Sequence, residues 1–224
     1  IKNSLVLPFR FLAASDEIKK MTSNASVRKV LAAISKALDI SAENVPVFEG
    51  ETLVVLDVSG SMTHNANTLG NKSPHIIGGL FAAMIAKKNN SDFMTFDGSA
   101  RYISYNPLDT ITSIVSRISF NGGSTDFHTI FKTANKKYDR VIILSDMQGW
   151  VQARAANGPF AEYKRKFNVT PYLYSFDLQN YGSMQFPENN VFCVAGFSDK
   201  IFDIMQLLEQ DKKALINEIK KVKL

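Results

Sequence analysis

Two short apolar runs constrain the fold of this 224-residue chain more than any other feature of its sequence. One forms the centre of residues 51–58 and the other lies within residues 140–144. Such continuous runs are typical of strands that are buried on both faces of a parallel sheet. Parallel neighbours require long crossover connections, which are usually helical. The two runs therefore predict a sheet with helices packed on both of its faces.

The remainder of the chain alternates strand and helix patterns in the way that this arrangement needs. We expect further strands at residues 92–97, 101–105, 171–176 and 191–195. We expect helices at residues 75–88, 109–118, 126–137, 159–167, 199–208 and 212–222. This order predicts an α/β fold with a Rossmann-like, doubly wound, mostly parallel sheet. Ligands of such sheets bind beyond the carboxyl ends of the strands, so chemistry is expected there.

A helical segment precedes the α/β domain. Helical periodicity covers residues 9–21 and 26–38, and Ser26 stands where it can cap the second helix. The apolar stripe of that helix consists of Val27, Val30, Leu31, Ile34 and Leu38. A polar stretch then leads into the first buried strand. The sequence thus predicts a short helical segment over residues 1–48 and one α/β domain over residues 49–224.

Composition excludes several classes of protein. A hydrophobic share of 45% and a charged share of 21% are ordinary for a globular domain and exclude a disordered chain. No apolar run approaches the roughly 20 residues of a membrane span, since the longest, Ile76–Ala86, is interrupted by glycines. Cys193 is the only cysteine, so no disulfide can form within the chain and a reducing, cytoplasmic location is expected. The chain opens at Ile1 rather than methionine, which suggests a piece of a longer protein.

The net charge of +5 gives only a weak case for nucleic-acid binding. The basic excess is spread along the whole chain instead of being concentrated in one part. One dense basic cluster, Lys164–Lys166, falls on a predicted helix, where a solvated helix face explains it. Charge alone therefore identifies no partner.

Carboxylates and hydroxyls gather at the ends of the two buried strands. Asp57, Ser59 and Ser61 follow the first strand at alternate positions of a tight loop, and Asp146 follows the second. Thr125 lies after two glycines on a turn before a helix. All of these side chains offer hard oxygen donors, which suit the near-octahedral coordination of Mg²⁺. The sequence therefore predicts a divalent cation site built from three loops.

Other chemistries fit these residues less well. A phosphatase with Asp57 as its nucleophile needs a second aspartate two positions later, where this chain has Ser59. A serine hydrolase needs a Gly-x-Ser-x-Gly turn, and neither serine of this loop lies in one. A loop whose polar residues only cap backbone groups is the plain structural alternative. The three histidines are interpreted as surface or capping residues: His64, His75 and His128.

The string DVSGSM at residues 57–62, the glycine-preceded Thr125 and the Ser145-Asp146 pair resemble a known motif. They are similar, in the same chain order, to the metal-ion-dependent adhesion site of von Willebrand factor type A (vWA) domains. The resemblance implies that Ser59 and Ser61 bind the ion directly, and Thr125 directly or through water. Asp57 and Asp146 would help directly or through waters. The expected ion is Mg²⁺, with Mn²⁺ or Ca²⁺ as alternatives.

A narrower resemblance comes from the flanking segments. PFRFLAASDEI, KALDISAENVPVFEG, GGSTDF and VAGFSDKIFDIMQLL are similar to the C-terminal part of Ro autoantigen proteins, the TROVE family. In that family a ring of helical repeats is closed by a vWA domain, so residues 1–48 would be the last helices of the ring. The resemblance implies a non-enzymatic module of a ribonucleoprotein that binds small noncoding or defective RNA, mostly through the ring. The alternative is a vWA module that captures an acidic residue of a protein partner, with no role for RNA.

Overall fold

The computed structural model describes residues 8–63, 73–148, 157–179, 186, 189–195, 200–210 and 220. Its core is a six-stranded sheet with the strand order β3-β2-β1-β4-β5-β6. The strands are β1 (Thr52–Asp57), β2 (Asp92–Phe96), β3 (Ala100–Ile103), β4 (Arg140–Ser145), β5 (Tyr172–Asp177) and β6 (Val191–Ala195). All neighbours are parallel except β3, which runs antiparallel to β2 at the edge. The predicted doubly wound, mostly parallel sheet is confirmed.

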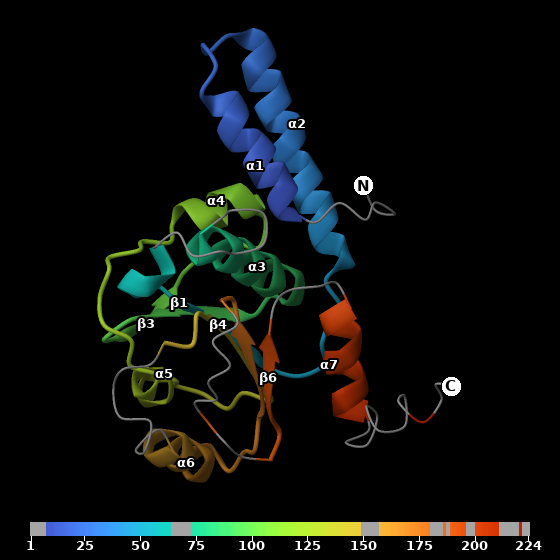
Figure 1. Cartoon of the computed structure of the whole chain (residues 1–224). Helices are drawn as coiled ribbons and strands as arrows, with labels where there is room; N and C mark the ends of the chain where they lie inside the picture. The colour runs from blue at the N-terminus through green and yellow to red at the C-terminus, as the bar shows by residue number, and fades with distance from the viewer. Residues whose placement is uncertain are drawn as a thin grey trace.

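Helices cover both faces of this sheet (Figure 1). The helices α3 (Pro74–Asn89), α4 (Ile111–Ser116) and α7 (Lys200–Gln210) share one apolar core with one face of the strands. The helices α5 (His128–Thr133) and α6 (Asn157–Phe167) share a second core with the other face. Successive residues of β1 alternate between the two cores, which is why its sequence is apolar throughout.

Two predicted helices are shorter than their periodicity indicated. The segment predicted at 126–137 is helical only over His128–Thr133, because Ala134 leaves helical geometry with a ψ of 120°. Tyr138 then donates its backbone N–H to Tyr163 Oη on α6 instead of to a helical carbonyl. The segment predicted at 109–118 is helical over Ile111–Ser116. The helix predicted at 212–222 lies outside the described residues except for residue 220.

Gly78 allows α3 to pack closely on the sheet. A Cβ atom at residue 78 would lie 2.9 Å from Leu178 Cδ1 and 3.0 Å from Leu56 Cδ1. The neighbouring Gly79 has ordinary van der Waals distances of 3.5 Å or more. Of these two glycines, only Gly78 therefore requires the absence of a side chain.

The amino-terminal segment forms a helical hairpin of α1 (Pro8–Lys19) and α2 (Ala25–Ser41). Ser26 is not the N-cap of α2, contrary to the prediction from sequence. Asn24 takes that role, because its Oδ1 accepts the Val27 N–H at 2.9 Å. Asp39 ties the hairpin to the domain by accepting the Lys87 ammonium and the Ile111 N–H, each at 3.0 Å. No helix within the described part of the chain has the length and apolar character to cross a bilayer.

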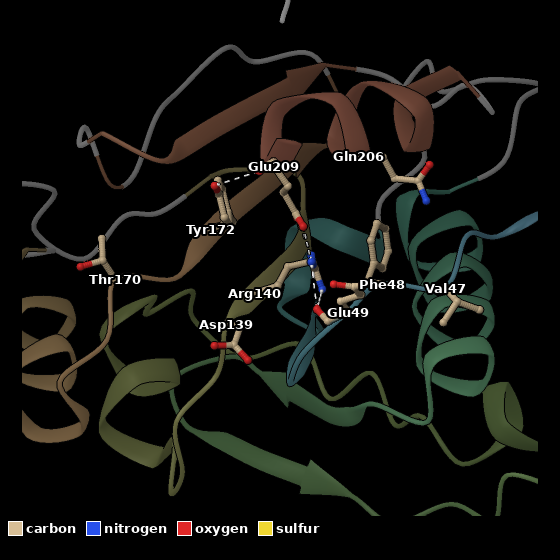
Figure 2. A pocket seen from close by; sticks show the side chains of 9 residues that line it. All are labelled: Val47, Phe48, Glu49, Asp139, Arg140, Thr170, Tyr172, Gln206 and Glu209. Carbon is tan, nitrogen blue, oxygen red and sulfur yellow. Dashed lines mark hydrogen bonds and ion pairs between the residues drawn. The ribbon is translucent and has the colours of Figure 1, made fainter. Parts of the chain in front are cut away.

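Arg140, at the start of β4, joins three parts of the fold around a cavity of about 470 Å³ (Figure 2). Its Nε donates to Glu209 Oε1 of α7 at 2.6 Å, and its Nη2 donates to Glu209 Oε2. Its Nη1 donates to Thr52 Oγ1 of β1 at 2.8 Å, and both Nη atoms reach the Glu49 carbonyl at 3.3 Å. These contacts use all five N–H donors of the guanidinium. The cavity thus offers an anionic ligand no free donor from Arg140.

Candidate metal centre

Three loops meet at the carboxyl edge of the sheet. The strands β1 and β4 are neighbours, with Leu56 paired to Leu144, so their following residues emerge side by side. The loop after β1 is joined to the 122–126 loop by the Gly60 N–H, which donates to the Gly123 carbonyl at 3.0 Å. The structure therefore brings together all three segments that carry the predicted cation ligands.

Asp57 organises the first loop and connects it to β4. Its Oδ1 accepts the Ser59 N–H at 2.8 Å, and its Oδ2 accepts the Ser145 hydroxyl at 2.6 Å. Burial raises the pKa of Asp57 to about 6, although these hydrogen bonds act to lower it and the nearby Asp146 adds to the rise. A nearby cation would offset the burial of this charge.

The two serine hydroxyls of the loop lie close enough to share an ion. Ser59 Oγ and Ser61 Oγ are 3.3 Å apart. Two adjacent oxygens of an octahedral Mg²⁺ shell lie about 3 Å apart, given metal–oxygen distances near 2.1 Å. The spacing of the two hydroxyls therefore fits neighbouring positions around one cation.

Thr125 and Ser124 have opposite surroundings. Thr125 is buried, whereas Ser124 is exposed and packs near Gly98, where an added Cβ would lie 2.9 Å from Ser124 Oγ. Gly122 has a φ of +77°, which a residue with a side chain rarely adopts. The glycine turn thus leads the chain into a position where Thr125, and not Ser124, is the buried hydroxyl.

Asp146 supplies the observation that most directly concerns a cation. It is fully buried, and its Oδ1 accepts the Gln148 N–H at 3.2 Å. Its Oδ2 has no hydrogen-bond partner among the residues that the structure describes. A buried carboxylate oxygen without a partner is destabilising unless a cation or a water satisfies it. The donor set of carboxylates and hydroxyls fits a hard divalent cation.

Comparison with known proteins places this arrangement in a family. A family model described as the Ro60 vWA domain matches residues 51–208. The chain belongs to the Ro60 vWA domain family. Among solved structures, the Ro (RSR) protein of Deinococcus radiodurans shares the fold, with 21% identity and a TM-score of 0.63. That match covers 88% of this chain and 42% of the Deinococcus protein, so the chain spans less than half of that protein's length.

Another structural neighbour is proximal thread matrix protein 1 from the mussel byssus, in a form described as having a zinc-occupied MIDAS motif. It has 16% identity and a TM-score of 0.44, and the match covers 88% of this chain and 53% of that protein. No curated protein sequence matches this one.

The histidines of the vWA domain occupy different surroundings. His75 Nδ1 lies 3.2 Å from the Met62 carbonyl, and burial lowers the pKa of its imidazole. His128 is buried in the first turn of α5. His64 lies outside the described residues. In the described part of the chain, no three His, Cys, Asp or Glu residues form a metal-binding group, so the hydroxyls are essential to the candidate site.

Sequence reasoning missed two residues that shape this site. The sequence identifies Ser145 only as the neighbour of Asp146, yet its hydroxyl bridges Asp57 to β4 and accepts the Met147 N–H at 2.9 Å. Asp97, directly after β2, is buried beside the loop that carries Thr125. The available signal for Asp97 was its position, since it follows a parallel strand as the two predicted aspartates do.

Proposed function

We propose that this vWA domain binds one divalent cation, Mg²⁺ in the cell, through Asp57, Ser59, Ser61, Thr125 and Asp146. The observation that carries the proposal is the buried Oδ2 of Asp146, which lacks a partner among the described residues and lies near the buried Asp57. Two carboxylates balance the charge of a divalent ion, and the three hydroxyls are neutral hard donors. Mn²⁺ and Ca²⁺ are the alternative ions.

The proposed activity is binding and not catalysis. The bound cation would supply an electrophilic position for an anionic oxygen from a partner, which can be a carboxylate or a phosphate. Ser59 and Ser61 are assigned to the cation as ligands, and their mutual distance of 3.3 Å suits that role. Asp57 is assigned two roles: it contributes its charge to the cation, directly or through water, and it holds the loop in shape through the Ser59 N–H and the Ser145 hydroxyl.

We further propose that the domain acts within a Ro-type ribonucleoprotein whose full-length form binds noncoding RNA. Membership of the Ro60 vWA domain family supports this role. The small, dispersed charge of +5 suggests that the domain alone binds RNA weakly and with little sequence preference. The single cysteine suits a cytoplasmic location. The second candidate function is capture of an acidic residue of a protein partner, which the anion preference of the cation favours equally.

Titration calorimetry with Mg²⁺ tests the cation site. We expect one binding event in the wild-type protein and none in Asp57→Ala, with the same circular dichroism spectrum for both. Asp16→Ala, at a side chain 40% exposed on the hairpin helix α1, is the matched control and should bind like the wild type. Equal heats from the wild type and Asp57→Ala would overturn the assignment.

RNA binding by the isolated chain separates the two candidate functions. We expect weak complexes with a structured RNA, falling steeply between 50 and 200 mM salt as phosphate contacts do. A tight complex that resists salt and needs Mg²⁺ would instead place RNA recognition at the cation itself. Magnesium-dependent binding of an acidic peptide, with no competition from RNA, would favour the protein-binding function.

A further inference from the structure

Asp97 lies where β2 turns into β3, next to the cation site but outside the set of proposed ligands. It is largely buried, at 8% exposure. Its Oδ1 accepts the Ser99 N–H at 2.9 Å and the Ser99 hydroxyl at 3.3 Å. Its Oδ2 lies 3.3 Å from Arg101 Nη2. The carboxylate is thus held in one orientation by its own turn.

This fixed carboxylate packs against the loop that carries Thr125. A Cβ atom at Gly123 would lie 3.2 Å from both Asp97 Cβ and Asp97 Cγ, so the loop backbone rests directly on the Asp97 side chain. The Asp97 carbonyl also accepts the Asp126 N–H at 2.9 Å. Asp97 therefore contacts the loop on both sides of Thr125.

The same loop has few restraints of its own. Gly122 and Gly123 precede Thr125, and glycine loses more backbone freedom on ordering than any other residue. On its other side the loop is held by the Gly60 N–H, which donates to the Gly123 carbonyl. The loop is consequently clamped between Gly60 of the first site segment and Asp97.

We propose that Asp97 is a positioning residue of the cation site, which sets the place of the Thr125 hydroxyl by supporting residues 123–126. The inference rests on the proposed cation binding. Asp97 acts through the shape and hydrogen bonds of its side chain, because Arg101 already offsets its negative charge. Residues that orient the ligands of a metal in this way typically change its affinity by about 10- to 100-fold when removed.

The test compares Mg²⁺ affinity by calorimetry in Asp97→Ala and Asp97→Asn. We expect Asp97→Ala to weaken binding about tenfold, since the packing of the carboxylate against Gly123 is lost, although the residue 97 carbonyl still accepts the Asp126 N–H. Asp97→Asn keeps the acceptor for Ser99 and nearly the same side-chain volume. Its Mg²⁺ affinity should therefore stay within about twofold of the wild-type value, a much smaller change than in Asp97→Ala. Asp109→Ala is the matched control, because it also removes a turn carboxylate paired with an arginine, Arg117 at 2.7 Å. It should leave the affinity unchanged.

Two further measurements separate positioning from general destabilisation. In a double-mutant cycle, Asp97→Ala should weaken binding no further once Thr125→Ala is present. In the metal-free protein, the amides of Gly60 and Asp126 should exchange faster in Asp97→Ala and not in Asp97→Asn.

Several outcomes would overturn the inference. One is a wild-type Mg²⁺ affinity in Asp97→Ala, and another is additive losses of affinity in the double-mutant cycle. A third is an equal loss of affinity in Asp97→Ala and Asp97→Asn, which would show a role for charge. These results leave cation binding itself intact. Absence of any Mg²⁺ binding by the wild-type protein would overturn the proposed function and this inference together.

Discussion

Strand β4 has a buried charge at each end, and the surroundings of the two charges differ. Arg140 begins the strand at 3% exposure, with every N–H donor bound by Glu209, Thr52 or the Glu49 carbonyl. Asp146 directly follows the strand and is fully buried. Its Oδ2 has no hydrogen-bond partner in the described part of the chain. The hydrogen-bonding groups of the charge are therefore saturated at the Arg140 end of the strand, whereas the Asp146 end keeps an acceptor without a donor among the described residues.

This difference indicates two different roles for buried charge. A buried ion pair that is fully hydrogen-bonded holds its elements together but has no capacity for a ligand. A buried carboxylate oxygen without a donor destabilises the protein on its own and gains most from an added cation. The amino edge of the sheet, with its cavity, is accordingly structural, and the carboxyl edge is the candidate site.

The largest expected effect comes from removing Arg140 from its ion pair with Glu209. Arg140→Met should lower the free energy of unfolding by about 4 kcal/mol, because Glu209 would lose the cation of its ion pair inside the fold and keep only the Tyr174 hydroxyl as a side-chain donor in the described part of the chain. Urea denaturation measures this loss. The double variant Arg140→Met/Glu209→Met should recover most of it, since neither charge then remains. A double variant as unstable as the single one would show that packing against Phe48, and not the charge pair, stabilises this end.

The next largest effect is expected from Mg²⁺ binding at the Asp146 end of β4. At Mg²⁺ concentrations about 100 times the dissociation constant, the wild type should gain about 2.7 kcal/mol of stability. EDTA should reverse the gain, and Asp57→Ala should show none. Arg140→Met should show the same increment as the wild type, because the two ends of β4 are independent. A smaller increment in Arg140→Met would show that the ends are coupled.

The sequence predicted the sheet well because burial on both faces leaves a direct record in the residues. Val54, Val55 and Leu56 contact two different cores, so β1 is apolar without interruption. The strand-end positions of Asp57 and Asp146 followed from the same pattern. Their role as ligands stays a prediction, although the structure brings their loops together.

Features that depend on contacts distant in sequence were not predictable in the same way. The hydroxyl of Ser145 reaches Asp57, 88 residues away, and Asp97 supports a loop more than 20 residues later along the chain. The helix predicted at 126–137 ends early because Ala134 leaves helical geometry, and the Tyr138 N–H then donates to Tyr163 of α6, a residue distant in sequence. Even the local choice between Asn24 and Ser26 as N-cap depended on where the backbone turned.

A smaller effect is expected from removing the buried charge of Asp146. Asp146→Asn should raise the stability of the metal-free protein by about 1.5 kcal/mol, because it removes a buried charge that also repels Asp57. The same change should abolish the calorimetric Mg²⁺ signal. Urea denaturation in EDTA is the measurement, with Asp16→Asn on α1 as the control. A loss of stability in Asp146→Asn would mean that Oδ2 is already satisfied without metal, for example by a water.

The smallest effect concerns the coordination position proposed for a partner. Ser61→Asp places a third carboxylate at the site, which should keep or strengthen Mg²⁺ binding while reducing the attraction of the ion for an external anion. We expect the affinity for acetate to fall about fivefold, or roughly 1 kcal/mol, in the presence of saturating Mg²⁺. Amide chemical shifts of Ser59 during an acetate titration report this affinity. Ser61→Asn is the matched control, since it offers an oxygen donor of similar size without the charge and should keep acetate binding near the wild-type value. Undiminished acetate binding in Ser61→Asp would show that the anion does not bind at the cation, and the carboxyl edge would then hold a structural ion, like the saturated pair at the opposite end of β4.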